Sequence, residues 1–192
     1  METSIERMRV AASLAWRSNP VSNAYCVGCL LVDRATDCIV ATGFSREMAG
    51  NTHAEEVALE KLTASTARAA GSSSSSSSID SAAEASAPTP PPTYDMYTTM
   101  EPCSVRLSGN TTCADRIIAD GRIARVFVGV LEPAALVVCE GVAKLRAAGV
   151  EEAGGPGEIS EESTAVPPLP PVGPPQGDGC ECRCGKACAC GG

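Results

Sequence analysis

The fold is decided by residues 113–131, which read CADRIIADGRIARVFVGVL. Residues 113–120 predict a short helix, and Gly121 is the residue type that commonly ends one. Residues 125–131 predict a strand without polar alternation, as expected when both faces of a strand are covered. A helix followed directly by such a strand indicates an α/β domain.

The neighbouring segments continue this succession of helices and strands. Hydrophobic spacing and turn residues predict six further elements: helix 3–17, strands 25–32 and 38–43 as an antiparallel hairpin, helix 52–67, strand 95–100 and helix 140–148. The chain order is then helix, strand, strand, helix, strand, helix, strand, helix. This order predicts a mixed central sheet with helices on both faces, a three-layer α/β/α fold.

Two stretches do not fit a packed core. Residues 64–93 are rich in serine, alanine and proline, and they cannot bury enough apolar surface to offset the entropy cost of ordering. We expect a disordered insertion there. Residues 151–192 are first acidic, then proline-rich, then cysteine-rich, and we expect a disordered tail. One folded domain is therefore expected over residues 1–150, interrupted by the insertion.

Composition excludes several classes of partner. The net charge is −8 and only 3% of the residues are aromatic, whereas a nucleic-acid-binding protein normally carries a basic face. The longest apolar runs, residues 24–32 and 126–131, fall far short of the ~18 residues that a membrane helix needs. Residues 1–20 include charged side chains and no secretory apolar core. We expect no nucleic-acid or membrane partner, and a location in the cytoplasm or the nucleus.

Histidine and cysteine are the informative residue types. The chain has 1 histidine, His53, and 11 cysteines. A single histidine excludes metalloprotease sites and zinc fingers that need two. In a reducing compartment, thiols are more plausible as metal ligands or core residues than as disulfides.

A candidate metal site combines His53 with Cys103 and Cys113. His53 and Glu55 fall in the first turn of a predicted helix, Cys103 follows a strand, and Cys113 opens another helix. A catalytic zinc ion keeps three nitrogen or sulfur ligands and leaves its fourth position to water. Helix N-termini also stabilise thiolates. A His-x-Glu motif followed by Pro-Cys and a second cysteine is the pattern of zinc deaminases, in which the glutamate is not a ligand.

In such a site, Glu55 takes a proton from the activated water and delivers protons to the ring nitrogen and the leaving amine. Each part also has another interpretation when taken alone. Thr52 and Glu55 have the spacing of a helix capping box. Cys103 and Cys113 are also consistent with buried structural thiols. The joint occurrence of these residues favours the zinc site.

Several motifs together resemble the riboflavin-biosynthesis branch of the cytidine deaminase-like superfamily. They are NTHAE at 51–55, TMEPCS at 99–104, CAD at 113–115, VGVLEP at 128–133, YCVGC at 25–29, GFSRE at 43–47 and RLSGN at 106–110. The last three are most similar to the fungal members, which deaminate 2,5-diamino-6-ribitylamino-4(3H)-pyrimidinone 5′-phosphate. The resemblance covers roughly residues 5–150 apart from the insertion.

The resemblance implies a cytidine deaminase-like fold and a zinc-dependent hydrolase that holds Zn²⁺ at His53, Cys103 and Cys113. The implied products are ammonia and 5-amino-6-(5-phospho-D-ribitylamino)uracil. A homodimer is the expected assembly, because dimers are common in this family. The rival functions are deamination of cytosine nucleotides or tRNA, and metal binding without catalysis.

The spacing of the two cysteines departs from most of the superfamily. Cys113 lies ten residues after Cys103 instead of three, and the position at the usual spacing is Arg106. A long loop here is typical of the riboflavin branch, and it supplies groups suited to phosphate and polyol. Arg106 is the first candidate for the phosphate and Arg46 the second, with a solvated surface arginine as the alternative for each. Further polar candidates for substrate binding are Asn51, which is equally suited to capping the turn, Asn23, Ser104, Ser108 and Asn110.

A cysteine cluster ends the chain. Its members are Cys180, Cys182, Cys184, Cys188 and Cys190. Alternating cysteines without an apolar core are typical of thiolate clusters for Cu(I) or Zn²⁺. Incidental thiols in a disordered tail are the alternative.

Overall fold

The fold is described from a computed structural model, which describes residues 4–71, 92–106, 108–131 and 140–153. The elements, in chain order, are α1 (Ser4–Ala15), β1 (Gly28–Asp33), β2 (Ile39–Phe44), α2 (Ala54–Gly71), β3 (Tyr94–Met100), α3 (Cys113–Asp120), β4 (Ile123–Val130), α4 (Gly141–Ala147) and β5 (Glu151–Ala153). The expected succession of elements is confirmed, with β5 added at its end.

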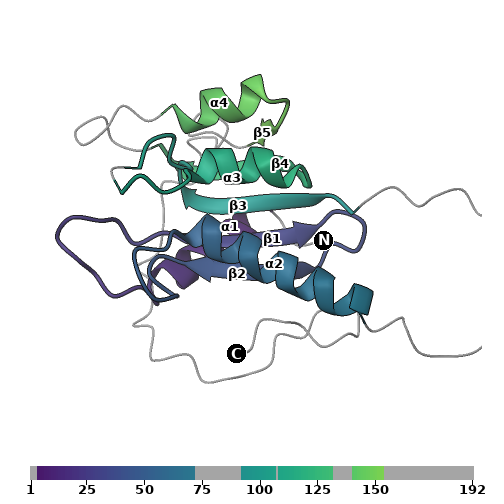
Figure 1. Ribbon diagram of the computed structural model, residues 1–192, viewed down its shortest axis with the longest axis horizontal. Coiled ribbons are helices and arrows are strands. Elements are labelled where there is room, and N and C mark those ends of the chain that lie inside the picture. The colour runs from purple at the N-terminus through teal and green to yellow at the C-terminus, as the bar shows by residue number, and fades with distance from the viewer. Residues whose placement is uncertain (1–3, 72–91, 107, 132–139, 154–192) are drawn as a thin grey trace, which may run out of the picture.

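The strands form one mixed sheet in the order β2-β1-β3-β4-β5 (Figure 1). β1 pairs antiparallel with β2 and with β3, whereas β3, β4 and β5 run parallel. Parallel neighbours need a crossover connection, and α3 and α4 provide the two crossovers. The carboxyl ends of β3 and β4 therefore lie at the same edge of the sheet.

Two cores lie on opposite faces of the sheet. Alternate residues of β1 enter different cores: Leu31 joins the larger one, with α2, α3 and α4, and Leu30 joins the smaller one, with Ala11 and Leu14 of α1. Figure 1 shows α1 behind the sheet, and α2 and α3 in front of it. The predicted three-layer α/β/α fold is confirmed.

The start of α4 packs tightly against the end of β3. A Cβ atom on Gly141 would lie 1.8 Å from the carbonyl oxygen of Pro102, so only glycine permits this approach. The side chain of Glu101 accepts a hydrogen bond of 3.0 Å from the backbone N–H of Val142 in the first turn of α4. These contacts position the chain immediately before Cys103.

Several predicted boundaries are wrong. α2 continues to Gly71, into the stretch expected to be an insertion, and the hydroxyls of Ser65 and Thr66 bond back to the carbonyl of Leu62. β5 lies in the expected tail, because pairing with β4 satisfies its backbone groups. β1 begins at Gly28 instead of residue 25. The expectation that both faces of β4 are covered is also wrong. Val126 and Val128 are buried on one face, whereas Phe127, which points to the other face, is only half-buried.

The serine run at 72–78 and the five cysteines at 180–190 lie outside the described residues. Within the described part of the chain, no helix is long and apolar enough to cross a membrane.

Candidate active site

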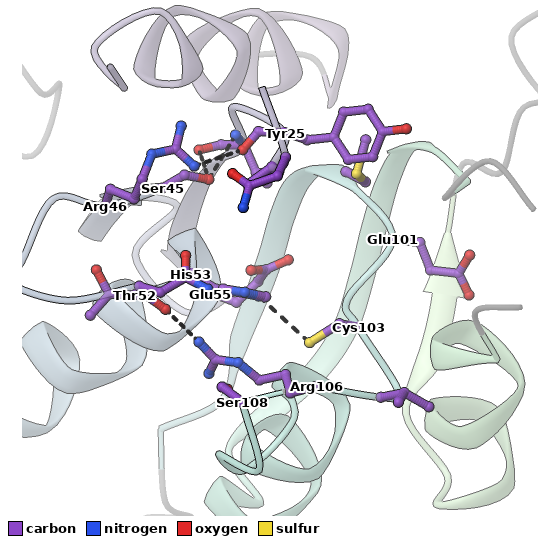
Figure 2. A pocket seen from close by; sticks show the side chains of 16 residues that line it. Tyr25, Ser45, Arg46, Thr52, His53, Glu55, Glu101, Cys103, Arg106 and Ser108 are labelled. Atoms are coloured by element: carbon purple, nitrogen blue, oxygen red, sulfur yellow. Dashed lines mark hydrogen bonds between the residues drawn. The ribbon is translucent and has the colours of Figure 1, made fainter. Parts of the chain in front are cut away.

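The start of α2 positions His53 and Glu55. His53 precedes the helix, and its backbone N–H donates to the carboxylate of Glu56 at 3.3 Å. The hydroxyl of Thr52 bonds instead to the carbonyl of Met48 at 3.2 Å. A capping box between Thr52 and Glu55 is therefore wrong: Glu56 supplies the capping carboxylate, while Glu55 lines the pocket (Figure 2).

Cys103 and Cys113 reach His53 from two other segments. Cys103 lies beyond the end of β3, and Cys113 is the first residue of α3, where Thr112 caps the helix. The Nδ1 atom of His53 lies 3.6 Å from Sγ of Cys103 and 3.4 Å from Sγ of Cys113. All three ligand atoms lie within 4.8 Å of one another. Tetrahedral zinc, with bonds of about 2.0 Å to nitrogen and 2.3 Å to sulfur, requires spacing of this kind.

The two thiols differ in how readily they ionise. The hydrogen bond with the Cys113 side chain and the contact with His53 lower the pKa of Cys103 to about 4, and the backbone N–H of Cys113 also donates to its sulfur at 3.3 Å. The same thiol–thiol hydrogen bond, together with burial and the charge of Glu55, raises the pKa of Cys113. A divalent cation bound between them would make both ligands thiolates. The donor set therefore fits zinc.

Glu55 is the acid–base candidate beside this site. Its side chain is buried, and burial raises its pKa above the ordinary value for glutamate. Oε1 accepts a hydrogen bond of 3.0 Å from the hydroxyl of Thr98, and Oε2 lies 3.4 Å from Sγ of Cys113. A buried carboxyl group with a raised pKa is suited to taking up and returning a proton.

His53, Glu55 and Cys103 line a pocket of about 320 Å³ (Figure 2). Arg46 and Tyr25 lie on one side of it, Arg106 and Ser108 on the other, with His53 and Glu55 between them. Of the predicted substrate-binding residues, five line the pocket: Asn23, Arg46, Asn51, Arg106 and Ser108. Ser104 and Asn110 are not among its lining residues; the hydroxyl of Ser104 accepts a hydrogen bond from the backbone N–H of Glu140.

The two candidate arginines have different surroundings. The Arg106 side chain is 3% exposed and forms a salt bridge of 2.8 Å with Glu56, so it is not a solvated surface residue. Arg46 is half-buried and donates to the carbonyls of Asn19 and Tyr25 and to the sulfur of Cys26. Among the described residues Arg46 forms no salt bridge, which leaves its charge without an acidic partner.

Sequence reasoning missed Thr98 and Glu56. Thr98 lies on the strand predicted at 95–100, but only the pairing and packing of β3 direct its hydroxyl to Glu55. Glu56 lies beside Glu55 in the sequence, and its three-residue spacing from His53 was the available signal.

Comparison with known proteins agrees with this geometry. The family model described as "Cytidine and deoxycytidylate deaminase zinc-binding region" matches residues 1–130. The diaminohydroxyphosphoribosylamino-pyrimidine deaminase of Schizosaccharomyces pombe is 39% identical over 147 residues, which is 76% of this chain and 30% of that protein. The chain therefore spans less than a third of the length of this relative.

Solved structures show the same similarity. The Rib2 deaminase of Aspergillus oryzae, crystallised in complex with DARIPP, matches with a TM-score of 0.62 and 33% identity, over 79% of this chain and 82% of that one. RibD of Acinetobacter baumannii matches with a TM-score of 0.55 and 23% identity, over 78% of this chain and 34% of that one, which shows the shared fold alone. Since the matched region includes all three candidate zinc ligands and Glu55, the chain belongs to the cytidine and deoxycytidylate deaminase family and carries its zinc-binding region.

Proposed function

We propose that the chain is a zinc-dependent hydrolase that deaminates 2,5-diamino-6-ribitylamino-4(3H)-pyrimidinone 5′-phosphate in riboflavin biosynthesis. The products are ammonia and 5-amino-6-(5-phospho-D-ribitylamino)uracil. The observation that carries the proposal is the convergence of His53, Cys103 and Cys113 beside the buried carboxyl group of Glu55. The DARIPP complex of the A. oryzae enzyme supports the choice of substrate, and the name of the S. pombe relative, a phosphoribosylamino-pyrimidine deaminase, supports a phosphorylated diaminopyrimidine as its class.

The chain's own residues divide the chemistry between them. His53, Cys103 and Cys113 would hold a zinc ion, which would supply the Lewis acidity that activates water. Glu55 takes the two protons of that water in turn at Oε2, the oxygen nearer to the cysteine ligand; it passes the first to the ring nitrogen and the second to the departing amino group, which leaves as ammonia. Thr98 holds the other oxygen of the carboxylate.

The pocket supports a small phosphorylated substrate. Arg46 lines it without a salt-bridge partner among the described residues, so we propose that Arg46 binds the phosphate. Arg106, our first candidate from the sequence, is already paired with Glu56. Asn23, Asn51 and Ser108 supply amide and hydroxyl groups for the polyol and the ring edge.

Two broader expectations belong to the same proposal. We propose a cytoplasmic location, because Cys26, Cys29, Cys103 and Cys113 are thiols and not members of disulfides among the described residues, as is usual in reducing compartments. We propose a homodimer, from the family resemblance, and its mass in solution tests this.

The test is product identification with the purified chain. Ammonia release should be observed from the ribitylaminopyrimidinone phosphate and not from deoxycytidylate or tRNA. Turnover of deoxycytidylate alone would show that the proposed substrate is wrong.

Replacing Glu55 by Gln should leave the zinc content unchanged and lower kcat by at least about 10²-fold, the lower end of the usual contribution of a general acid–base group. A Glu55→Gln variant with wild-type kcat would favour a metal-binding protein without this mechanism.

We also propose that the five cysteines at 180–190 bind Cu(I) or Zn²⁺, on the basis of their alternating spacing. The full chain should bind more metal than a chain truncated at Gly154. Equal metal content in the two forms would reject a metal-binding tail.

A further inference from the structure

Of the loop between the two cysteine ligands, residues 104–112, two described side chains are buried: Thr112, which caps α3, and Arg106. Among its described residues, Val105 and residues 108–111 are exposed to solvent, whereas the Arg106 side chain is 3% exposed. The loop therefore has little apolar packing of its own to keep Cys103 and Cys113 at a fixed separation. Cys103 accepts hydrogen bonds from the backbone N–H groups of Cys113 and Ala114, and the rest of the anchoring comes from the contacts of Arg106.

Arg106 contacts the chain close to two of the three candidate zinc ligands. Its Nη1 donates to Glu56 at 2.8 Å and to the carbonyl of Thr111, two residues before Cys113, at 3.3 Å. Its Nη2 donates to the carbonyl of Asn51, two residues before His53, at 2.6 Å. One guanidinium thus links the segment before His53 with the segment before Cys113.

Glu56 extends this link to α3. One of its oxygens accepts from Arg106 and from the backbone N–H of His53, and the other accepts from Arg116 at 2.6 Å. The Glu56 side chain is 9% exposed, so water does not replace these bonds easily. Removing one partner of such a buried pair leaves the other charge without compensation.

We propose that Arg106, Glu56 and Arg116 form a clamp that holds the zinc ligands in place before the metal binds. Arg106 is then a positioning residue for the metal site and not a ligand of the substrate phosphate. Ligands that are already in place lose less conformational entropy on binding, so the clamp raises zinc affinity. This inference rests on the proposed zinc deaminase, but its main readout requires no substrate.

The first measurement is the zinc dissociation constant of the full-length protein, by competition with a chelator of known affinity. Arg106→Met and Arg116→Met should each weaken zinc binding by about tenfold or more, the usual effect of losing a residue that orients metal ligands. Arg106→Lys should recover only part of the affinity, because an ammonium cannot reproduce the fork of bonds to Glu56, Thr111 and Asn51. Arg46→Met is the matched control and should bind zinc as tightly as the wild type.

The second measurement separates the clamp from phosphate recognition. With saturating zinc, kcat/KM is compared for the phosphorylated substrate and its dephosphorylated form. Arg106→Met should keep the wild-type preference for the phosphorylated form, and Arg46→Met should lose it. Arg116 does not line the pocket, so weaker zinc binding in Arg116→Met would have no explanation in substrate recognition.

Two results would overturn the clamp. One is wild-type zinc affinity in Arg106→Met together with a lost preference for phosphate. The other is wild-type zinc affinity in Arg116→Met, since Glu56 would then not act through both arginines. If Arg106→Met does not fold, the zinc dissociation constants of Arg116→Met and Glu56→Gln test the clamp instead, and both variants should bind zinc more weakly than the wild type. Absence of turnover by the wild-type protein would contradict the proposed function and leave the zinc measurements valid.

Discussion

At the scale of single residues, the position of Glu55 depends on one hydroxyl group. Thr98 is fully buried, and its hydroxyl lies 3.0 Å from Oε1 of Glu55 and 3.0 Å from the carbonyl oxygen of Met100. A hydroxyl has one hydrogen, so the donor serves one of these two acceptors at a time. When it serves Glu55, it orients the carboxylate with Oε2 toward the cysteine ligand.

We therefore expect Thr98→Val to lower kcat with little change in KM or zinc content. The loss of one hydrogen bond to a charged group corresponds to about 1.5–3 kcal/mol, or roughly 10- to 150-fold in kcat. Steady-state kinetics and metal analysis on the same preparation measure this. Thr98→Ser keeps the hydroxyl and should restore most of kcat. Wild-type kcat in the valine variant would mean that other contacts hold Glu55.

At the scale of elements, the site depends on how closely α4 approaches the end of β3. Gly141 contacts the carbonyl of Pro102, and Glu101 binds the first turn of the same helix. Since Cys103 follows directly, the N-terminus of α4 supports the segment that carries this ligand. The close approach needs a residue without a side chain.

We expect Gly141→Ala to lower the free energy of unfolding by about 1–3 kcal/mol, because the added methyl group meets backbone atoms that cannot rotate away. Urea denaturation measures the change. Ala143→Gln, at an exposed position of α4, is the control and should change stability by less than about 0.5 kcal/mol. Equal stability of Gly141→Ala and wild type would show that α4 shifts at little cost.

At the scale of the whole molecule, the metal site joins segments that the core already holds together. The larger core includes Ala54 of α2, Ala114 of α3 and Val142 of α4, and none of these contacts needs a metal. The pocket lies where β3 ends and α2 begins. Residues 72–91 connect the opposite ends of these two elements.

Removal of zinc should therefore leave the fold intact and lower its stability. A ligand present at 1,000 times its dissociation constant stabilises the folded state by about 4 kcal/mol. After a chelator has removed the zinc, the protein should keep its far-ultraviolet circular dichroism spectrum at 25 °C and unfold at a lower melting temperature. Adding zinc back should restore the melting temperature. Loss of the helical signal at 25 °C would mean that the metal is required for folding.

Replacement of residues 72–91 by a Gly-Ser linker of the same length should leave kcat and KM within about twofold of the wild type. This segment joins the end of α2 to the start of β3, whereas the pocket lies at the start of α2 and the end of β3. A large rise in KM would show that the segment reaches the pocket.

The sequence by itself determined the order of the main elements and the candidate zinc site. A single histidine leaves little choice of nitrogen ligand, and helix and strand patterns are local, so Glu55, Cys103 and Cys113 could be assigned from residue type and spacing. Tertiary structure alone decided the roles of Glu56, Thr98 and Arg106, the length of α2 and the existence of β5. Apart from the length of α2, these depend on burial and on contacts between residues about 20 to 60 positions apart, which spacing does not encode. From the sequence, Arg106 was a candidate for the phosphate or a solvated surface arginine; the fold instead buries its side chain against Glu56 of α2.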